Sequence, residues 1–356
     1  MDESEWLQQM GQPGFWDLQT RQQKLERKKD FLNRLNQMVP WETFRPTLRQ
    51  IREKPRKSTA GRKPLDELLL FKMLVLQKLY NISDEDLEYQ VNDRLSFMQF
   101  LGLGLEARVP DATTVWLFRE QLQQRGLVEA LFEQFESYLQ QSGYQAQDGQ
   151  ILDATLVPVP KQRNRKEENQ QIKAGQVPEA WLEQPHKRAQ KDVDARWTKK
   201  NNVSHFGYKD HISIDAGFGF IRRYAVTDAS VHDSQVLGAL LDIDNPDERL
   251  WADSAYRSEA RLEVLQWMGF EPLFNERAYR NSPLSDEQKA ANRERSKTRA
   301  KVEHVFGSWV TEGGGKLLRT IGIARAKTNL GLQNLVYNLK RLVVLETQAM
   351  RAEIAG

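Results

Sequence analysis

The stretch Ile151-Leu152-Asp153-Ala154-Thr155-Leu156-Val157 decides the fold, because hydrophobic residues recur in it with a period of two after a region with helical periodicity. It predicts a β-strand that Pro158 and Pro160 close. The change of period near residue 145 indicates a boundary between a helical part and a mixed part of the chain. A carboxylate among apolar neighbours is costly to bury unless it is paired or binds a metal ion, which makes Asp153 a candidate functional residue.

The residues after this strand predict the rest of a mixed sheet. Tyr208–Ile214 and Phe220–Val226 are expected to form a hairpin around Asp215-Ala216-Gly217. A helix, a strand and a second helix follow at about 233–241, 250–253 and 258–268. Strand, hairpin, helix, strand and helix in this order predict an α/β fold of the ribonuclease-H type, in which one edge of a mostly parallel sheet is antiparallel.

The residues before the first strand predict several short helices joined by tight turns. Ser83 is one expected N-cap, and Thr113 or Thr114 is another. Such helices resemble a helix-turn-helix arrangement, in which Trp116 and Arg119 of the last helix are candidate contacts with nucleic acid. A small helical bundle that only dimerises is an equally good interpretation, since helix-turn-helix signals are weak in a sequence pattern.

These changes of pattern predict the domain organisation. Residues 1–60 form a basic helical segment, 61–145 a helical, helix-turn-helix-like domain that binds DNA, and 146–345 a catalytic domain with a basic insertion at 161–205. Residues 346–356 form a C-terminal tail. A last core helix is indicated by apolar residues at helical spacing: Leu332, Leu335, Val336, Leu339, Leu342 and Val343.

Charge is unevenly distributed along the 356 residues. Lys and Arg outnumber Asp and Glu by fourteen to four between residues 21 and 63, by twelve to six between 161 and 209, and by six to one between 289 and 301. Separate basic surfaces of this kind favour a polyanionic partner, although a solvated helix face explains most single runs. Zero cysteines exclude a disulfide framework. With neither a signal sequence nor a long apolar run, we expect a cytoplasmic protein without a membrane partner.

Three acidic residues each stand where a secondary-structure element meets a basic surrounding. Asp153 lies in the first strand, Asp253 ends the strand 250–253, and Glu303 lies in a helix expected at 299–310. Two aspartates on strands and one glutamate on a helix can hold a pair of Mg²⁺ ions, and such a pair suits a phosphodiester substrate. The plainer alternatives are a turn-capping Asp253 and an ordinary surface ion pair between Glu303 and Arg299. Glu303 is expected at the rim of an apolar stripe formed by Val302, Val305, Phe306, Trp309 and Val310.

The insertion between about 161 and 202 lacks hydrophobic periodicity, so we expect a mobile segment that orders on DNA. Trp181 and Trp197 are candidates for stacking on an unpaired base, with Lys199 and Lys200 holding phosphates. Local packing is a somewhat better interpretation of Trp197 taken alone.

Several strings occur in an order that resembles bacterial DDE transposases of the insertion-sequence-five family. They are Asp153-Ala154-Thr155, Gly207-Tyr208-Lys209 with His211, His232-Asp233, Asp253-Ser254-Ala255-Tyr256 and Arg299-Ala300-Lys301-Val302-Glu303-His304. The stretch from Gly61-Arg62-Lys63-Pro64 to Phe118-Arg119 is similar to the amino-terminal domain of that family. The resemblance covers most of residues 40–345.

The resemblance implies a ribonuclease-H-like catalytic domain in which Asp153, Asp253 and Glu303 bind two Mg²⁺ ions, or Mn²⁺ in their place. It implies binding to the terminal inverted repeats of an insertion sequence, cleavage at the element ends, and transfer of the 3′-hydroxyl ends to target DNA. The implied partners are double-stranded DNA and a second copy of the chain in a homodimer on DNA. The implied location is the bacterial cytoplasm, in association with the nucleoid when the protein is bound to DNA.

The basic stretches and the family motifs together give the candidate DNA contacts. They are Arg62, Lys63, Trp116, Arg119, Trp197, Lys199, Lys200, Lys209, Tyr256, Arg257, Arg299, Lys301 and Lys316. One departure concerns the catalytic helix, where the related signature has a tyrosine and a lysine but this chain has Ser296 and Val310. Lys316, beyond the glycines 313–315, is the candidate to supply the missing cation.

Two other function classes fit the same residues. A non-catalytic, sequence-specific DNA-binding regulator would use the helical domain and the basic segments without metal-dependent cleavage. A metal-dependent nuclease without joining activity would use the same three acids. A zinc hydrolase finds little support, because the chain has five histidines and no His-Glu-x-x-His spacing.

Overall fold

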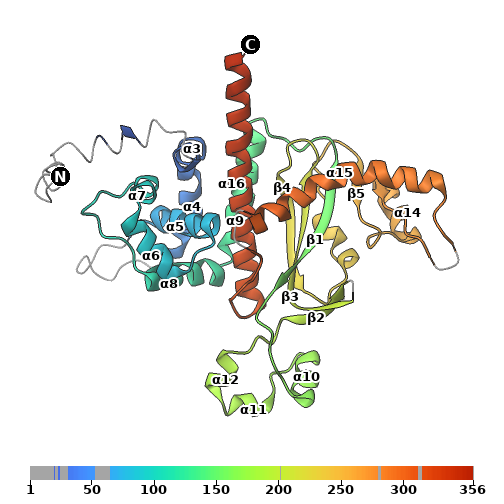
Figure 1. Cartoon of the computed structure of the whole chain (residues 1–356), viewed down its shortest axis with the longest axis horizontal. Coiled ribbons are helices and arrows are strands. Elements are labelled where there is room, and N and C mark those ends of the chain that lie inside the picture. The colour runs from blue at the N-terminus through green and yellow to red at the C-terminus, as the bar shows by residue number, and fades with distance from the viewer. Residues whose placement is uncertain are drawn as a thin grey trace, which may run out of the picture.

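The computed structural model describes residues 20, 23–24, 31–52, 65–200, 202–279, 282–311 and 315–355. A helical region and a mixed α/β part lie on either side of the long helix α16 (Ile323–Ala355), as Figure 1 shows. Arg62, Lys63 and Pro64 lie outside the described residues. Within these ranges, no helix is both long enough and apolar enough to span a bilayer.

A six-stranded mixed sheet forms the centre of the α/β part. Its strands are β1 (Gln150–Pro158), β2 (Arg196–Lys200), β3 (Val203–Asp215), β4 (Ile221–Asp228), β5 (Arg249–Ala252) and β6 (Glu271–Phe274). β1, β5 and β6 run parallel, whereas β3 is antiparallel to β1, β2 and β4. This topology, with helices on both faces, is a ribonuclease-H-like mixed α/β core, and it confirms the predicted fold.

The central strand β1 is buried on both faces because its apolar residues alternate in direction. Ile151 and Leu152 are both fully buried, the first in the larger hydrophobic core and the second in a smaller core on the opposite face. Helix α15 (Asp286–Thr311) and α16 cover the Ile151 face. The helices α13 (Leu237–Leu240) and α14 (Glu259–Trp267) cover the Leu152 face. Asp153, two residues after Ile151, therefore belongs to the α15 face.

The expected helical region is present with different caps. Its helices are α3 (Phe31–Met38), η1 (Trp41–Phe44), α4 (Arg45–Arg49), η2 (Gln50–Arg52), α5 (Glu67–Tyr80), α6 (Asp84–Asp93), α7 (Leu95–Leu101), α8 (Ala112–Gln124) and α9 (Leu127–Gln141). Ser83 caps α6 as predicted, because its side chain accepts a hydrogen bond from the Asp86 N–H. The prediction of a threonine cap for α8 was wrong: the Asp111 side chain accepts from the Thr114 N–H.

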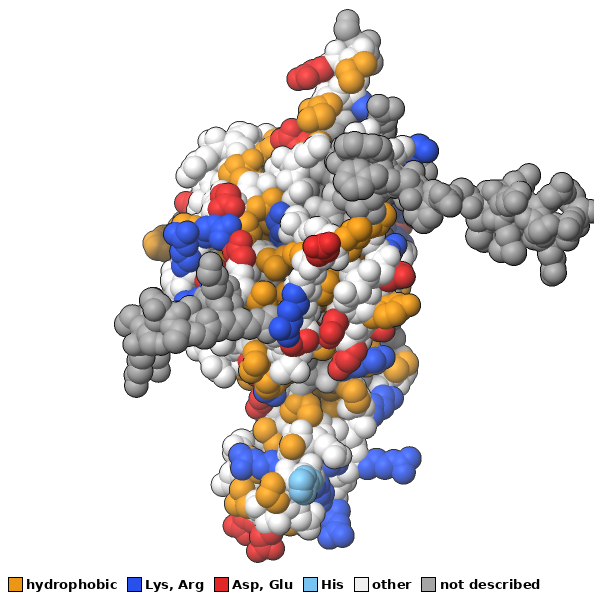
Figure 2. All heavy atoms as spheres, turned by 90° about the vertical axis from the view of Figure 1, so that its left-hand side faces the viewer, with side chains coloured by type: hydrophobic (Ala, Val, Ile, Leu, Met, Phe, Trp, Pro, Cys, Tyr) orange, Lys and Arg blue, Asp and Glu red, His pale blue; other side chains and the backbone are white. Residues whose placement is uncertain are grey.

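The insertion is ordered, contrary to the expectation of a mobile segment. It contains α10 (Lys166–Lys173), α11 (Glu179–Leu182) and α12 (Pro185–Ala189) before β2. Trp181 is fully buried, and its Nε1 donates to Glu168 Oε1 at 2.7 Å. Lys187 donates to the same oxygen at 2.8 Å. A single buried indole with a satisfied polar group thus gives this short segment a core that its composition did not indicate. The insertion forms the lower lobe in Figure 2, where Lys and Arg side chains surround it.

The insertion joins the sheet at a crowded point. Pro158 pairs with Gly207, where β3 lies between β1 and β2. Gly207 has φ +154°, and a Cβ there would lie 2.2 Å from the Val157 carbonyl oxygen. Only glycine fits this approach of two strands. This packing gives a physical reason for the glycine in the Gly207-Tyr208-Lys209 string.

Helix α16 confirms the predicted core helix, since all six of its expected core residues are buried. The helix continues to Ala355, so residues 346–355 extend it instead of forming a separate tail. Because α16 contacts β3 and β4 as well as α3, α5, α8 and α9, it joins the sheet to the helical region.

Candidate active site

Two aspartates meet where β1 and β5 run side by side. The strands are parallel, and their register pairs Ile151 with Trp251. Continued by two residues, this register brings Asp153 level with Asp253, which directly follows β5. Neighbouring strands lie about 4.8 Å apart, and level residues share a face, so the two side chains start from adjacent positions. They stand at the carboxyl edge of the parallel strands, where open α/β sheets bind ligands.

Asp153 is half-buried, and both negative and positive charges act on its carboxyl group. Burial, with a smaller contribution from Asp253, raises the pKa of the Asp153 carboxyl to about 6. A hydrogen bond of 2.8 Å from the Ala154 N–H to Oδ1 and the positive charges of Arg299 and Lys200 act in the opposite direction. The carboxylates and both cations therefore lie within electrostatic reach of one another.

Glu303 lies on α15, which crosses β1 and β5. The buried stripe of this helix consists of Val302, Val305, Phe306 and Trp309, and Glu303 is exposed beside it as predicted. Val310 is 53% exposed and does not belong to the stripe, contrary to the expectation. Trp309 in the same turn is buried, so Val310 is exposed because it lies about 100° further round the helix, at the edge of the stripe.

Two anchoring contacts fix which way α15 is turned. Lys301 Nζ donates to the Ala216 carbonyl at 2.7 Å, beside the turn that follows β3. On the other side of the helix, Asn292 accepts from the Glu276 N–H at 2.9 Å and donates to the Glu276 carbonyl at 2.9 Å, beyond the carboxyl end of β6. Glu303 follows Asn292 by eleven residues, which is about three turns, so both lie on the same side of α15. Glu303 therefore faces the edge that carries the two aspartates.

The donor atoms fit a hard divalent cation in part. Carboxylate oxygens are the ligands that Mg²⁺ prefers, and a cation between Asp153 and Asp253 would relieve the burial that raises the pKa of Asp153. No group of three or more histidine or acidic side chains is close enough to hold an ion among the residues that the structure describes. The aspartate pair is thus assembled, whereas Glu303 faces it from α15 without joining the cluster.

Lys316 lies beside the aspartates, as expected for the cation that substitutes at the missing lysine position. Its Nζ donates to Thr155 Oγ1 at 2.7 Å and lies 5.1 Å from the ring centroid of Phe306. Thr155 follows Asp153 by two residues and shares its face of β1. Burial lowers the pKa of Lys316, and the charge of Asp153 opposes that effect. An ammonium group bound two residues along the strand from Asp153 is placed to bind a phosphate oxygen.

Two more candidates line this edge. The Arg299 Nε is buried with no hydrogen-bond partner among the described residues, and its charge acts on Asp153. Arg257 is half-exposed in the turn after Asp253.

Tyr256 is fully buried, and its hydroxyl has no partner within the described part of the chain. Its burial excludes the expected DNA contact in this structure; burial, with the nearby carboxylates, also raises the pKa of Tyr256.

Two predicted DNA contacts already have partners in the protein. Lys209 Nζ lies 2.8 Å from Asp233 Oδ1 and donates to the Val231 carbonyl at 2.7 Å. Lys301 is bound to the Ala216 carbonyl. Both ammonium groups support loops next to the catalytic edge, so the structure does not offer them to a phosphate.

The helical region agrees only in part with a DNA-reading surface. Trp116 is 42% exposed on α8, as a contact residue should be. Arg119 is buried, and its guanidinium donates to Asp84 at 2.7 and 2.9 Å and to Gln77 at 2.9 Å. The expected DNA contact of Arg119 is therefore not available. Residues 65–145 carry six Lys and Arg against thirteen Asp and Glu, which disfavours a polyanion on these helices alone.

The insertion presents one of its two tryptophans. Trp181 is enclosed and cannot stack on a base. Trp197 is 47% exposed on β2, with Phe206 at 5.1 Å and Lys161 at 6.0 Å from its ring. Lys199 and Lys200 are exposed on the same strand. The charge of Lys200 acts on both Asp153 and Lys316, so β2 extends from the insertion towards the catalytic edge.

Two residues beside the aspartates, Thr155 and Asp210, were not among the predicted site residues. Thr155 holds Lys316, and Asp210 on β3 is paired with Thr155 in the sheet. Asp210 accepts a hydrogen bond from Asn334 Nδ2 at 3.3 Å, and complete burial raises its pKa well above the usual range. The period of two along β1 could have identified Thr155. Nothing local in the sequence distinguishes Asp210 from the neighbouring acids.

Two family models match the chain. Residues 19–121 match the family described as "Transposase domain (DUF772)", and residues 144–339 match the family described as "Transposase DDE domain". Among solved structures, the chain is similar to one described as the cryo-EM structure of the piggyBac transposase synaptic complex with hairpin DNA. That similarity has a TM-score of 0.46 and 12% sequence identity, and it covers 92% of this chain and 77% of the other.

Proposed function

The chain belongs to the transposase DDE domain family, which matches more than half of its length, and on this basis we propose that it moves an insertion sequence by cutting and joining DNA. It binds the terminal inverted repeats of the element, cleaves DNA at the ends and transfers the 3′-hydroxyl ends to target DNA. The observation that carries this proposal is the register of β1 and β5, which aligns Asp153 with Asp253 beneath α15.

In this proposal the three acids have one shared role. Asp153 and Asp253 hold divalent cations from the sheet, and Glu303 completes the ligand set from α15. When bound, two Mg²⁺ ions, or Mn²⁺, supply a Lewis acid for the phosphate and activation of the attacking hydroxyl. The half-buried Asp153 must be deprotonated to bind a cation, and its pKa of about 6 leaves it ionised at neutral pH.

The basic residues around the edge orient the DNA. Lys316 and Arg299 hold the phosphate at the reacting bond; Lys316 is bound to Thr155 on the strand of Asp153, and the buried Arg299 Nε has no hydrogen-bond partner among the described residues. Arg257 contacts the same strand from the turn after β5. Lys199 and Lys200 bind phosphates along β2, with Trp197 stacked on a nearby base.

The other parts of the chain bind the element end. Residues 1–60 carry twelve of the twenty Lys and Arg of the first 145 residues, and Arg62 and Lys63 follow them directly. Residues 61–145 supply the orienting helices, with Trp116 at the surface. Residues 146–345 form the catalytic unit. Two element ends require two active sites, so the working complex is a homodimer on DNA. We place the chain in the insertion-sequence-five family, in a bacterial cytoplasm and on the nucleoid when it is bound to DNA.

The test is a cleavage and joining assay on DNA that carries the two ends flanking this coding sequence, with Mg²⁺ or with EDTA. Glu303→Gln should abolish cleavage while the affinity for end DNA stays within about twofold. Glu294→Gln is the matched control, since Glu294 is an exposed acid of the same helix whose ion pair among the described residues is with Lys297 at 2.7 Å. This control should cleave like the unmodified protein.

Each other outcome would lead to a different conclusion. Binding without metal-dependent cleavage would indicate a DNA-binding regulator. Metal-dependent cleavage without joined products would indicate a nuclease. Cleavage retained in Glu303→Gln would remove this residue from the ligand set.

A further inference from the structure

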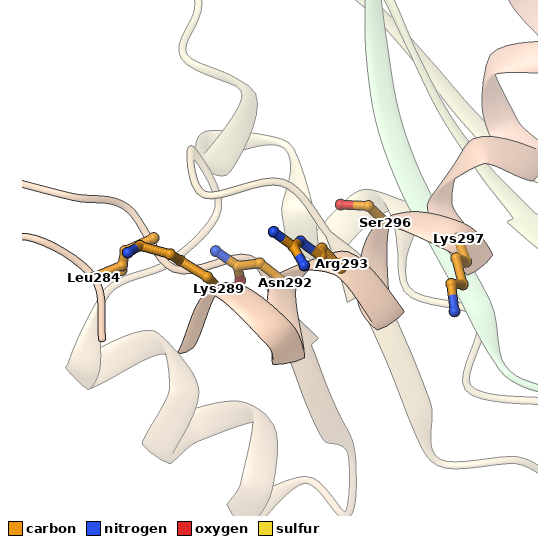
Figure 3. Close-up of a pocket in the computed structure, with 6 residues that line it drawn as sticks. All are labelled: Leu284, Lys289, Asn292, Arg293, Ser296 and Lys297. Atoms are coloured by element: carbon orange, nitrogen blue, oxygen red, sulfur yellow. The ribbon is translucent and has the colours of Figure 1, made fainter. Parts of the chain in front are cut away.

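The first half of α15 borders a hollow that the reaction at the acids does not use. The hollow has a volume of about 580 Å³ and is lined by Leu284, Lys289, Asn292, Arg293, Ser296 and Lys297. Figure 3 shows Asn292, Arg293 and Ser296 rising from the same side of the helix, with Lys289 reaching towards Leu284 and Lys297 at the opposite end. Five of its six lining side chains are polar, and three of these are cationic.

The three cations are regularly spaced. Lys289, Arg293 and Lys297 follow one another at intervals of four residues, and each interval advances about 6 Å along the helix axis. Arg293 has no ion pair or side-chain hydrogen bond among the described residues. Lys289 pairs with Asp286 at 3.0 Å and Lys297 pairs with Glu294 at 2.7 Å, but all four side chains of these pairs are more than half exposed. Exposed pairs of this kind contribute little and exchange readily for a phosphate.

The hollow opens beside the catalytic edge. Ser296 and Asn292 precede Glu303 by seven and eleven residues, about two and three turns, so they lie on its side of α15. The Ser296 Oγ accepts a hydrogen bond of 3.3 Å from Asn275, which follows β6. The hollow is therefore a continuation of the surface on which Asp153 and Asp253 stand.

The distance from the acids fixes which part of a DNA strand would reach these cations. Lys297 and Lys289 precede Glu303 by six and fourteen residues, which correspond to about 9 and 21 Å along the helix. Phosphates of a DNA strand are spaced by about 3.4 Å along the duplex axis, so this interval spans roughly three to six nucleotides.

We propose that this hollow binds the phosphate backbone of duplex DNA three to six nucleotides from the reacting phosphodiester. Lys289, Arg293 and Lys297 neutralise successive phosphates, while Asn292 and Ser296 supply uncharged hydrogen bonds. A long, open row of cations fits a polyanion laid along the helix better than a small enclosed anion. The proposal rests on the proposed function and adds to it the region of DNA that α15 holds.

The test compares two triple variants of the full chain. The first variant removes the three cations that line the hollow, by Lys289→Ala, Arg293→Ala and Lys297→Ala. In the control, Arg108→Ala, Lys327→Ala and Arg351→Ala remove three exposed cations elsewhere. The Kd for a duplex that carries the terminal repeat and its flanking DNA is measured over a series of salt concentrations. The slope of log Kd against log salt should become shallower by about 2.7 in the first variant, because each lost phosphate contact changes it by about 0.9. The control should keep the slope of the unmodified protein.

A second measurement uses the unmodified protein and therefore does not depend on the folding of a variant. Single uncharged methylphosphonates placed three to six nucleotides from the cut should weaken binding, and those placed more than about ten nucleotides away along the same strand should not. An unchanged slope in the first variant, an equal change in the control, or sensitivity only outside this window would each refute the proposal. Any of these results with normal metal-dependent cleavage leaves the proposed function intact, whereas absence of cleavage by the unmodified protein refutes the function itself.

Discussion

Replacing Asp153 with Asn should stabilise the metal-free protein, although it removes a carboxylate that we propose binds the metal ions. Asp153 has a pKa of about 6 in the folded protein against an ordinary value of 3.8, because burial disfavours its charge. The folded state thus binds the proton more tightly than the unfolded state between these two values, so this group's contribution to stability falls as pH rises through that window. Above pH 6 the ionised carboxylate costs on the order of 3 kcal/mol, since one pKa unit corresponds to about 1.4 kcal/mol.

The assay is urea unfolding of both proteins in EDTA over a range of pH. The free energy of unfolding of Asp153→Asn should exceed that of the unmodified protein by about 1 kcal/mol at about pH 4.5 and by about 3 kcal/mol at about pH 7.5, as the linkage relation requires. Added Mg²⁺ should stabilise the unmodified protein and leave the variant unchanged, which narrows the difference.

Asp215→Asn is the matched control on the neighbouring strand. Asp215 is fully buried, but it lies 2.9 Å from Arg222 Nε and accepts backbone hydrogen bonds from residues 218–220. Arg222 keeps Glu136 as a partner at 2.7 Å, but the substitution removes the carboxylate that accepts the three backbone N–H groups and should destabilise the fold by about 1–3 kcal/mol. A variant of Asp153 that is destabilised at neutral pH, or that gains the same amount at both pH values, would refute the reasoning about its burial.

Two further predictions concern residues whose partners only the structure reveals. Trp181→Ala should unfold α10 to α12 locally, because a buried tryptophan contributes about 3–5 kcal/mol; hydrogen exchange should rise in 161–195 alone, and unchanged protection would contradict the assigned core. Arg119→Met should lower the free energy of unfolding by about 3–5 kcal/mol by leaving Asp84 unpaired, with DNA affinity of the folded protein unchanged. A lower DNA affinity with an unchanged free energy of unfolding would indicate that Arg119 contacts DNA.

The elements that the sequence predicted well are those fixed by local periodicity. The alternation in β1 and the hairpin of β3 and β4 are present within about five residues of the expected bounds. The apolar stripe of α15 is present except for Val310, but the helix begins at Asp286 instead of Arg299. The approach of Asp153 to Asp253 also follows from strand order and register, both of which are properties of the sheet. Periodicity therefore predicted the strands on which Asp153 and Asp253 lie next to each other.

The failures all concern partners that are distant in sequence. Arg119 and Lys209 were predicted to be free for DNA. In the structure Arg119 pairs with Asp84, 35 residues away, and Lys209 pairs with Asp233, 24 residues away. Tyr256 read as a surface residue of a family motif, but it fills the smaller core. The insertion was predicted to be mobile because its composition is polar, but the buried Trp181 provides a small core for it. Only the three-dimensional packing reveals such contacts.

The insertion leaves the sheet at Pro158 and returns through β2 and the start of β3 to Gly207, which is directly paired with Pro158. The two ends of the intervening segment therefore stay about one strand spacing apart, whatever the length of the segment. A lineage can lengthen, shorten or exchange it without changing the alignment of Asp153 with Asp253. The proposed DNA contacts of the insertion can accordingly evolve independently of the proposed cleavage site.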